Sequence, residues 1–179
     1  MPDRVGEFYK VSFEQFYTAM KEEFGALSEP YVREIWEHIP VPTRATRGSA
    51  GYDIKAPFDF ELAPGMGLKS PTGIRVHIDE GWWLSCMPRS GLGFKYRLQL
   101  DNTIGVIDED YFGSSNEGHI FAKITNDSKT GKSVKVHKGD GFMQAIFVPY
   151  GITYSDAADG IRDGGMGSTD KKEEDSTGD

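Results

Sequence analysis

Cysteine is almost absent from this chain, because Cys86 is the only one among 179 residues. A single cysteine excludes an internal disulfide and a zinc site built from several cysteines. Since Cys86 lies in an apolar stretch, we expect it to be a small core residue rather than a nucleophile. Long apolar runs and a charged-then-apolar N-terminal signal are missing as well. We therefore expect a soluble, unexported, cytoplasmic protein with no membrane partner.

Positive charge is in the minority, with 20 Lys and Arg against 28 Asp and Glu and a net charge of −8. Such a balance is poorly suited to attracting nucleic-acid backbone, so we expect no direct nucleic-acid binding. Part of the excess lies in the tail "DKKEEDSTGD", which leaves the rest of the chain less acidic. Local arginines, backbone amides and a divalent cation can still bind a small polyphosphate. The charge argues against DNA as a partner, but not against nucleotides.

Glycine and proline are plentiful, with 22 and 9 copies, and they favour many turns between short strands. Short apolar or alternating runs recur between Arg44 and Tyr154, namely "FDFEL", "GIRVHI", "GWWLSCM", "YRLQL", "HIFAKIT", "SVKVH" and "FMQAIFV". This spacing predicts an all-β fold, either a sandwich or a closed barrel such as a jelly roll. We expect one domain over residues 1–154 and a flexible arm over the Gly- and Asp-rich residues 155–179.

Residues 12–38 interrupt the β pattern with apolar side chains at helical spacing. Ser12 is a plausible N-cap of a first helix and Gly25 a plausible stop. Ser28 is a plausible cap of a second short helix. This helical insertion carries no chemical motif, so we expect it to serve packing or to bind a protein partner.

Five short motifs carry the side chains suited to nucleotide chemistry, and they are "SAGYDI" (49–54), "PRSGLG" (88–93), "NTIGVIDEDYFG" (102–113), "GDGFMQ" (139–144) and "RDGGMGST" (162–169). In this order and at these separations they resemble the five motifs of the trimeric dUTP diphosphatases. The resemblance implies a jelly-roll-like dUTPase β-barrel and a homotrimer with composite sites at subunit boundaries. It also implies hydrolysis of dUTP to dUMP and pyrophosphate with Mg²⁺, which would keep uracil out of DNA and supply a thymidylate precursor.

The motif "PRSGLG" is expected to bind the triphosphate through Arg89, Ser90 and Gly91, by the same resemblance. A guanidinium pairs with phosphate oxygens in a bidentate way. A glycine lets its backbone amide approach an anion closely. The alternative is an ordinary turn with a surface arginine.

The motif "NTIGVIDEDYFG" holds Asp108, which matches the family carboxylate that activates water for attack on the α-phosphate. Glu109 and Asp110 are expected to face solvent or polar contacts, since strand alternation points Glu109 away from its neighbours. A solvated acidic turn is the alternative. Tyr111 closes this hairpin and, by resemblance, lies under the deoxyribose, where it leaves no room for a 2′-hydroxyl. Its alternative role is a hydrophobic lid on the barrel rim.

The same hairpin resembles the family element that reads uracil, with polar contacts from Asn102 and the backbone around Gly105, Val106 and Ile107. A tight hairpin rejects thymine for lack of space and cytosine because its amine donates where O4 accepts. The following stretch "YFGSSNEGHIF" is longer than the family norm, and we expect it to extend a hairpin beside the site.

The remaining two central motifs supply Asp53 and Gln144. By resemblance Asp53 holds the metal-bound water shell without ligating the metal, and a turn-stabilising aspartate is the alternative. The Gln144 amide would meet a phosphate oxygen or a metal-bound water. Magnesium is expected to be bound mainly by substrate phosphates and water. The four histidines show no metal-ligand spacing.

The C-terminal motif belongs to an arm that, in the family, folds over the occupied site of a neighbouring subunit. Arg162 matches the arginine that grips the outer phosphates, although it stands one residue nearer to the paired glycines than usual. Met166 replaces a common aromatic and would cover uracil by soft apolar contact. Further phosphate contacts are expected from Gly167, Ser168 and Thr169. A disordered tail is the alternative.

Two rival functions stay open. A dCTP deaminase shares this fold and much of its phosphate chemistry, but uses a glutamate on the strand after the hairpin, where "HIFAKIT" has no carboxylate. A regulatory binding protein could reuse the fold without catalysis, with the helical insertion facing its partner. Against this second rival, every proposed chemical position holds a competent residue type.

Overall fold

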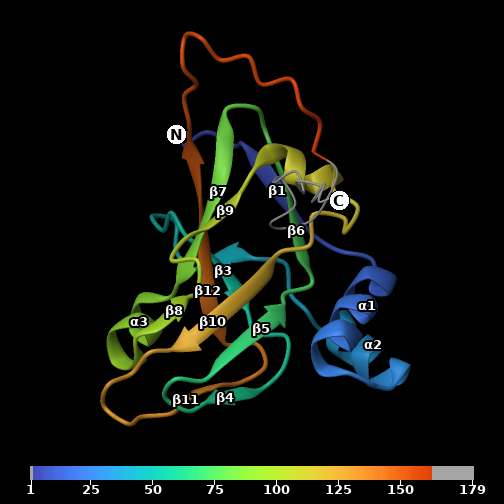
Figure 1. Cartoon of the computed structure of the whole chain (residues 1–179), viewed down its shortest axis with the longest axis vertical. Coiled ribbons are helices and arrows are strands. Elements are labelled where there is room, and N and C mark those ends of the chain that lie inside the picture. Colours follow the sequence, from blue (N-terminus) through green and yellow to red (C-terminus); the bar gives the residue numbers. More distant parts are fainter. Residues whose placement is uncertain (1, 163–179) are drawn as a thin grey trace, which may run out of the picture.

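The computed structural model describes residues 2–162. Most elements are short strands, which are β1 (Gly6–Lys10), β2 (Thr43–Arg44), β3 (Tyr52–Lys55), β4 (Phe60–Leu62), β5 (Gly67–Pro71), β6 (Ile74–Ile78), β7 (Trp82–Pro88), β8 (Leu98–Leu100), β9 (Gly105–Ile107), β10 (Phe121–Asn126), β11 (Val134–Val136) and β12 (Gly141–Pro149). The helices are α1 (Phe13–Phe24), α2 (Glu29–Glu37), α3 (Ser90–Tyr96) and the 3₁₀ helix η1 (Glu109–Gly113). The predicted all-β class is confirmed, and Figure 1 shows the strands forming one body with α1 and α2 on its flank.

The strands pair antiparallel throughout the described chain. The largest sheet has the order β2-β3-β12-β7-β9, and a second has the order β5-β10-β8. Two-stranded pairs, β1-β6 and β11-β4, complete the strand pairing. Strand β12 lies at the centre of the largest sheet between β3 and β7, and β9 pairs with the other side of β7 (Figure 1).

Register along β12 decides which side chains share a face. Gln144 pairs with Asp53 of β3 and with Met87 of β7. Its neighbours Met143 and Ala145 are buried, whereas Gln144 is only half-buried. Directly opposite residues point to the same face, and successive residues alternate. Gln144 and Asp53 therefore share one face of this sheet, and Met143 and Ala145 face the core on the other.

Two helices form within residues 12–38, although the Ser28 side chain makes no capping hydrogen bond to α2. Ser12 caps α1 by accepting a hydrogen bond from the Gln15 amide, and Gly25 ends the helix with a positive φ of 76°. The apolar faces of α1 and α2 are buried, with Phe16 and Val32 fully enclosed. Helix α1 contacts β5, so this insertion is part of the domain core rather than an appendage.

One helix was not predicted, and one local prediction is wrong. At "PRSGLG" the alternative to a phosphate site was an ordinary turn, whereas Ser90–Tyr96 form α3. The motif "NTIGVIDEDYFG" does not continue as a hairpin strand, because β9 ends at Ile107 and Glu109–Gly113 form η1. The longer stretch after Tyr111 therefore makes turns rather than an extended hairpin.

After β12 the chain runs from residue 150 to residue 162 without helix or strand, almost entirely exposed. None of the helices over residues 2–162 is both long enough and apolar enough to span a bilayer.

Candidate active site

A cavity of about 410 Å³ lies between β9, η1 and the β8–β10 pair. Seven of the predicted site residues line it, and they are Asn102, Gly105, Val106, Ile107, Asp108, Tyr111 and Arg162. Its inner surface is apolar, with Cys86, Leu100 and Met143 among the lining side chains. A concave apolar site with a few convergent polar groups is the usual form of a small-molecule site.

Asp108 lies at the junction between β9 and η1, where it is the residue preceding the helix. Its side chain is 48% exposed, so water can reach the carboxylate. Arg162 donates from Nη2 to Asp108 Oδ2 and from Nε to Asp110 Oδ1, the latter over 2.7 Å. The arm thus reaches back to the acidic motif of its own chain, and one guanidinium bridges two carboxylates.

Tyr111 forms a wall of this cavity from within η1. The residue is buried, and its hydroxyl donates to the His119 carbonyl over 2.8 Å while it accepts from Asn116 Nδ2 over 2.9 Å. Burial raises the pKa of the Tyr111 hydroxyl, which keeps the ring neutral. The Arg162 guanidinium carbon lies 5.7 Å from the ring centre. Tyr111 is therefore a fixed apolar surface rather than an acid or base.

Glu109 does not follow the predicted orientation. The strand-alternation argument is wrong here because the residue belongs to a 3₁₀ helix. Its Oε2 atom is buried and has no hydrogen-bond partner among the described residues. Asp110 does make the expected polar contact, since Arg162 binds it.

A second cluster of polar residues lies where β7 ends. We call it the Arg89 group, and it consists of Arg89, Asp53 and Gln144, followed by Ser90 and Gly91. Arg89 Nε lies 3.3 Å from Asp53 Oδ1 on β3. Gln144 lies on β12 directly opposite Asp53, and its Nε2 donates to the Pro88 carbonyl over 3.4 Å. Ser90 and Gly91 follow at the exposed start of α3. Arginine, hydroxyl and amide groups thus gather on one surface, as a polyanion site requires.

The structure does not bring the two groups together within one chain. Cys86 and Met143 line the cavity, whereas Gln144 alternates with Met143 along β12 and therefore faces the other side of the sheet. Arg89, Asp53 and Gln144 are also absent from the residues that line the cavity beside Asp108.

Comparison with known proteins identifies the family. The sequence profile described as dUTPase matches residues 37–169. The deoxyuridine 5′-triphosphate nucleotidohydrolase of Lactococcus lactis is 38% identical over 134 residues, covering 73% of this chain and 88% of the relative. The chain belongs to the dUTPase family. The N-terminal residues up to 36, with β1, α1 and most of α2, lie outside the matched region.

Solved structures support the same family and fold. A dUTPase from Streptococcus mutans aligns with a TM-score of 0.56 at 36% identity, covering 63% of this chain and 88% of that chain. A mutant dUTPase from phage phi11 of S. aureus aligns with a TM-score of 0.56 at 21% identity, covering 70% of this chain and 93% of that chain. At that lower identity the second likeness concerns the fold alone. The jelly-roll-like dUTPase architecture is therefore confirmed.

Cys86 is excluded as a nucleophile in this dUTPase. Cys86 lies in the cavity wall, but it is buried, and burial raises the pKa of its thiol to about 12. A thiol of that pKa is protonated at neutral pH and does not attack phosphorus. The expectation that Cys86 is a core residue is confirmed.

No group of three or more His, Cys, Asp or Glu side chains within residues 2–162 is arranged to hold a metal ion. A tight all-protein metal cage is therefore not offered by this part of the dUTPase. The oxygen donors Asp53 and Gln144 do suit Mg²⁺, which retains several waters and binds through one or two carboxylates together with substrate phosphates.

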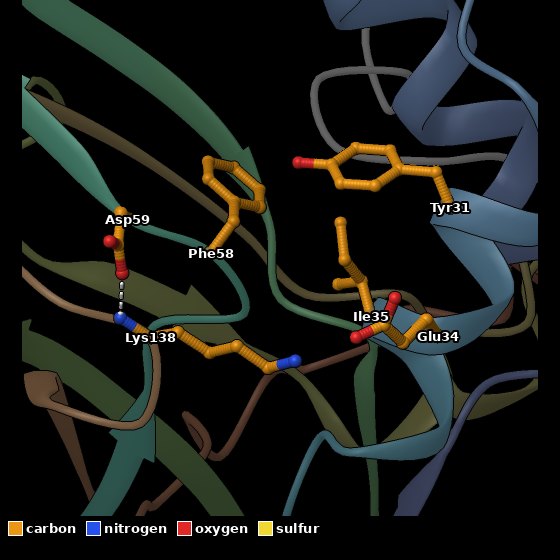
Figure 2. A pocket seen from close by; sticks show the side chains of 6 residues that line it. All are labelled: Tyr31, Glu34, Ile35, Phe58, Asp59 and Lys138. Atoms are coloured by element: carbon orange, nitrogen blue, oxygen red, sulfur yellow. Dashed lines mark hydrogen bonds between the residues drawn. The ribbon is translucent and has the colours of Figure 1, made fainter.

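A second cavity of about 310 Å³ lies between α2 and the loops around β4 and β11 (Figure 2). Tyr31, Glu34 and Ile35 line one side, while Phe58 and Lys138 line the other. The Lys138 amide donates to the Asp59 carboxylate over 2.6 Å. None of the predicted dUTPase site residues lines this cavity.

Sequence reasoning missed Gly51 and Gly141, although both stand inside the quoted motifs. An added Cβ at Gly51 would lie 2.8 Å from Gln144 Oε1, and one at Gly141 would lie 2.8 Å from Arg89 Nη1. It also missed Asn116, which holds the Tyr111 hydroxyl. Further predicted contacts lie outside the described residues, namely Met166, Gly167, Ser168 and Thr169.

Proposed function

We propose that this protein is a dUTP diphosphatase that hydrolyses dUTP to dUMP and pyrophosphate. Family membership supports this activity, and so do the relatives, which are named as deoxyuridine 5′-triphosphate nucleotidohydrolases. The observation that carries the proposal is the position of Asp108 at a cavity bounded by β9 and Tyr111. A water-accessible carboxylate beside a nucleoside-sized cavity fits hydrolysis better than binding alone.

Asp108 acts as the general base in this mechanism. Its carboxylate takes a proton from the water that attacks the α-phosphate, and pyrophosphate leaves with the β- and γ-phosphates. Arg162 binds both Asp108 and Asp110. A bound triphosphate competes for the guanidinium, so Arg162 turns to the outer phosphates and leaves Asp108 free to accept the proton.

The cavity supplies base and sugar recognition. The Asn102 side chain and the backbone of Gly105, Val106 and Ile107 present polar groups to the uracil edge, and the wrong base leaves such groups unpaired. The fixed ring of Tyr111 leaves no space for a 2′-hydroxyl. Together these contacts select deoxyuridine over cytidine, thymidine and ribonucleotides.

The active enzyme is a homotrimer in which the Arg89 group of one subunit meets the Asp108 cavity of another. The separation of the Arg89 group from the Asp108 cavity within one chain favours this assembly. Apolar side chains also lie exposed on the described chain, among them Val106 at 56%, Ile152 at 73% and Ile161 at 94%. Such side chains are suited to cover a neighbouring subunit.

Magnesium accompanies the triphosphate, with Asp53 and Gln144 as the residues that would hold its water shell. When bound, the ion neutralises phosphate charge. The phage phi11 dUTPase coordinates a structural Mg(II) ion. Arg89, Ser90 and Gly91 bind the phosphates themselves, and the residues after 162 would close over the occupied site.

The proposed cellular role is removal of dUTP from the cytoplasm, which keeps uracil out of DNA and provides dUMP for thymidylate synthesis. We further propose that residues 1–154 form one domain and residues 155–179 a C-terminal arm. The dCTP deaminase alternative is disfavoured because β10, Phe121–Asn126, carries no carboxylate.

A nucleotide panel tests the activity, with dUTP, UTP, dCTP and dTTP assayed for pyrophosphate and ammonia. We expect pyrophosphate release from dUTP alone. Substituting Asp108→Asn should lower kcat by about 10²- to 10⁴-fold, the usual contribution of a general base. The matched control is Asp110→Asn, which removes the other Arg162 partner and should cost less than about tenfold.

Wild-type rates in Asp108→Asn would remove the proposed base. Ammonia release from dCTP would favour a deaminase, and no turnover of any nucleotide would favour a binding protein.

A further inference from the structure

The segment between η1 and β10, residues 114–119, holds the hydroxyl of Tyr111 from two directions. Asn116 Nδ2 donates to it over 2.9 Å, and it donates to the His119 carbonyl over 2.8 Å. The Asn116 Oδ1 atom accepts from the Gly118 amide over 3.1 Å, which fixes the amide group itself. Neither Asn116 nor His119 lines the cavity, so both act on it through Tyr111.

The same segment is fastened to the helical insertion. The Glu117 carboxylate accepts from the Ser12 amide over 2.8 Å and from Ser12 Oγ over 2.6 Å. Ser12 Oγ in turn accepts from the Gln15 amide over 3.1 Å as the cap of α1. A carboxylate at a helix N-terminus is favourably placed with respect to the helix dipole. The start of α1 and the Tyr111 segment therefore form one hydrogen-bonded unit.

Backbone geometry shows that this segment is held rather than relaxed. Glu117 has a φ of +60°, an uncommon conformation for a residue with a side chain. Gly118 has a φ of +69°, and a Cβ there would lie 2.7 Å from the Tyr111 carbonyl. Strained conformations persist where surrounding contacts over-determine them. The Ser12 contacts supply that constraint at Glu117.

An apolar contact joins the insertion to the same place. His119 is fully buried, its Nε2 accepts from the Gly73 amide over 2.9 Å, and its ring centre lies 6.2 Å from that of Phe16 on α1. Figure 1 shows α1 lying on the same flank as β5 and β6, the strands joined by the Gly73 turn. The insertion thus contacts the segment on both its polar and its apolar side.

We propose that the helical insertion is a positioning brace for Tyr111, acting through Glu117 and Asn116. These two residues set how strongly the enzyme distinguishes deoxyribonucleotides from ribonucleotides, because they fix the ring that excludes a 2′-hydroxyl. The inference rests on the proposed function, in which Tyr111 lies against the sugar. Asn116, Glu117 and Ser12 are positioning residues, since none lines the cavity.

The test is the ratio of kcat/KM for dUTP to that for UTP, measured well below the melting temperature of each variant. Asn116→Ala should lower this ratio about tenfold, the effect of one lost hydrogen bond. Glu117→Ala and Ser12→Ala should lower it several-fold from outside the cavity, and Glu117→Gln, which keeps one acceptor, should be intermediate. Ser115→Ala changes an exposed residue of the same segment and should leave the ratio unchanged.

The possible results distinguish a failure of the proposed function from a failure of the brace. A wild-type chain that does not hydrolyse dUTP contradicts the proposed function. The brace is overturned if the wild type prefers dUTP to UTP and this preference is unchanged in all four variants of Asn116, Glu117 and Ser12. A fall in both substrates by the same factor, together with a lower melting temperature, also overturns it, because that is the result of a purely structural role. If Asn116→Ala fails to fold, the Ser12→Ala ratio decides.

Discussion

At the scale of single residues, two glycines leave room for the polar side chains of the Arg89 group. Gly51 lies against the Gln144 amide and Gly141 against the Arg89 guanidinium, each so closely that an added Cβ would lie 2.8 Å away. Neither has a positive φ, so backbone freedom is not the reason for glycine at these positions. Space for another residue's side chain is the reason, so both glycines would act on the proposed phosphate site indirectly.

Substituting Gly141→Ala should therefore weaken catalysis more than stability. The new methyl group displaces the flexible end of Arg89, which moves at little cost in folding free energy but loses its position beside Asp53. We expect kcat/KM for dUTP to fall about 10- to 100-fold, the scale of a misplacement near 1 Å. Steady-state kinetics and thermal melting check both halves of this prediction.

The matched control is Gly151→Ala, where a Cβ would have no neighbour within 4 Å. It should retain wild-type kinetics. Equal losses in both variants would show that Arg89 does not depend on the space at residue 141.

At the scale of elements, short-range patterns were predictable and long-range register was not. The alternation in "SVKVH" gives β11, and Ser12 caps α1 as its spacing predicts. The cavity residues of β9 and η1 were also found, because they are neighbours in sequence. The faces of Gln144 and Asp53 depend on pairing across residues far apart in the chain, which no local pattern encodes. Likewise, the sequence gives no sign that Glu117 is more than a surface charge, because its partner Ser12 is far away in the chain.

Buried His119, which packs against Phe16 of the helical insertion, should make the stability of the fold sensitive to acid. Burial, together with nearby Lys69, lowers the pKa of His119 from its ordinary value of 6.5 to about 3. Between these values the unfolded chain binds a proton that the folded chain does not. Stability is therefore fully present above the unfolded pKa and is lost as pH falls towards about 3.

For His119→Gln, which can still accept from the Gly73 amide, we expect a flatter dependence on pH. The free energy of unfolding of the wild type should fall by about 2 kcal/mol more than that of the variant between about pH 7 and about pH 5. Urea denaturation at a series of pH values measures this difference. Parallel pH profiles for the two proteins would show that His119 titrates normally in the fold.

At the scale of the whole molecule, the proposed site has two parts that lie apart within one chain. Arg89, Asp53 and Gln144 do not line the cavity beside Asp108. The proposed homotrimer would join the two parts, since each copy in a closed ring presents one of them to each neighbour. The same geometry makes catalysis depend on assembly, so dilution below the dissociation constant of the oligomer should abolish turnover.

Mixing two inactive proteins tests this arrangement directly. Asp108→Asn subunits retain the Arg89 group, and Arg89→Ala subunits retain the base, so a boundary between the two kinds can rebuild one intact site. Random assembly of equal amounts should restore about a quarter of the wild-type sites, because each boundary needs one particular subunit on each side. Co-refolding followed by a pyrophosphate assay measures the recovery, and a mixture of each variant with itself is the control. Recovery requires residues from two chains at one site, whereas persistent inactivity in proven mixed oligomers would place both groups in sites built from a single chain.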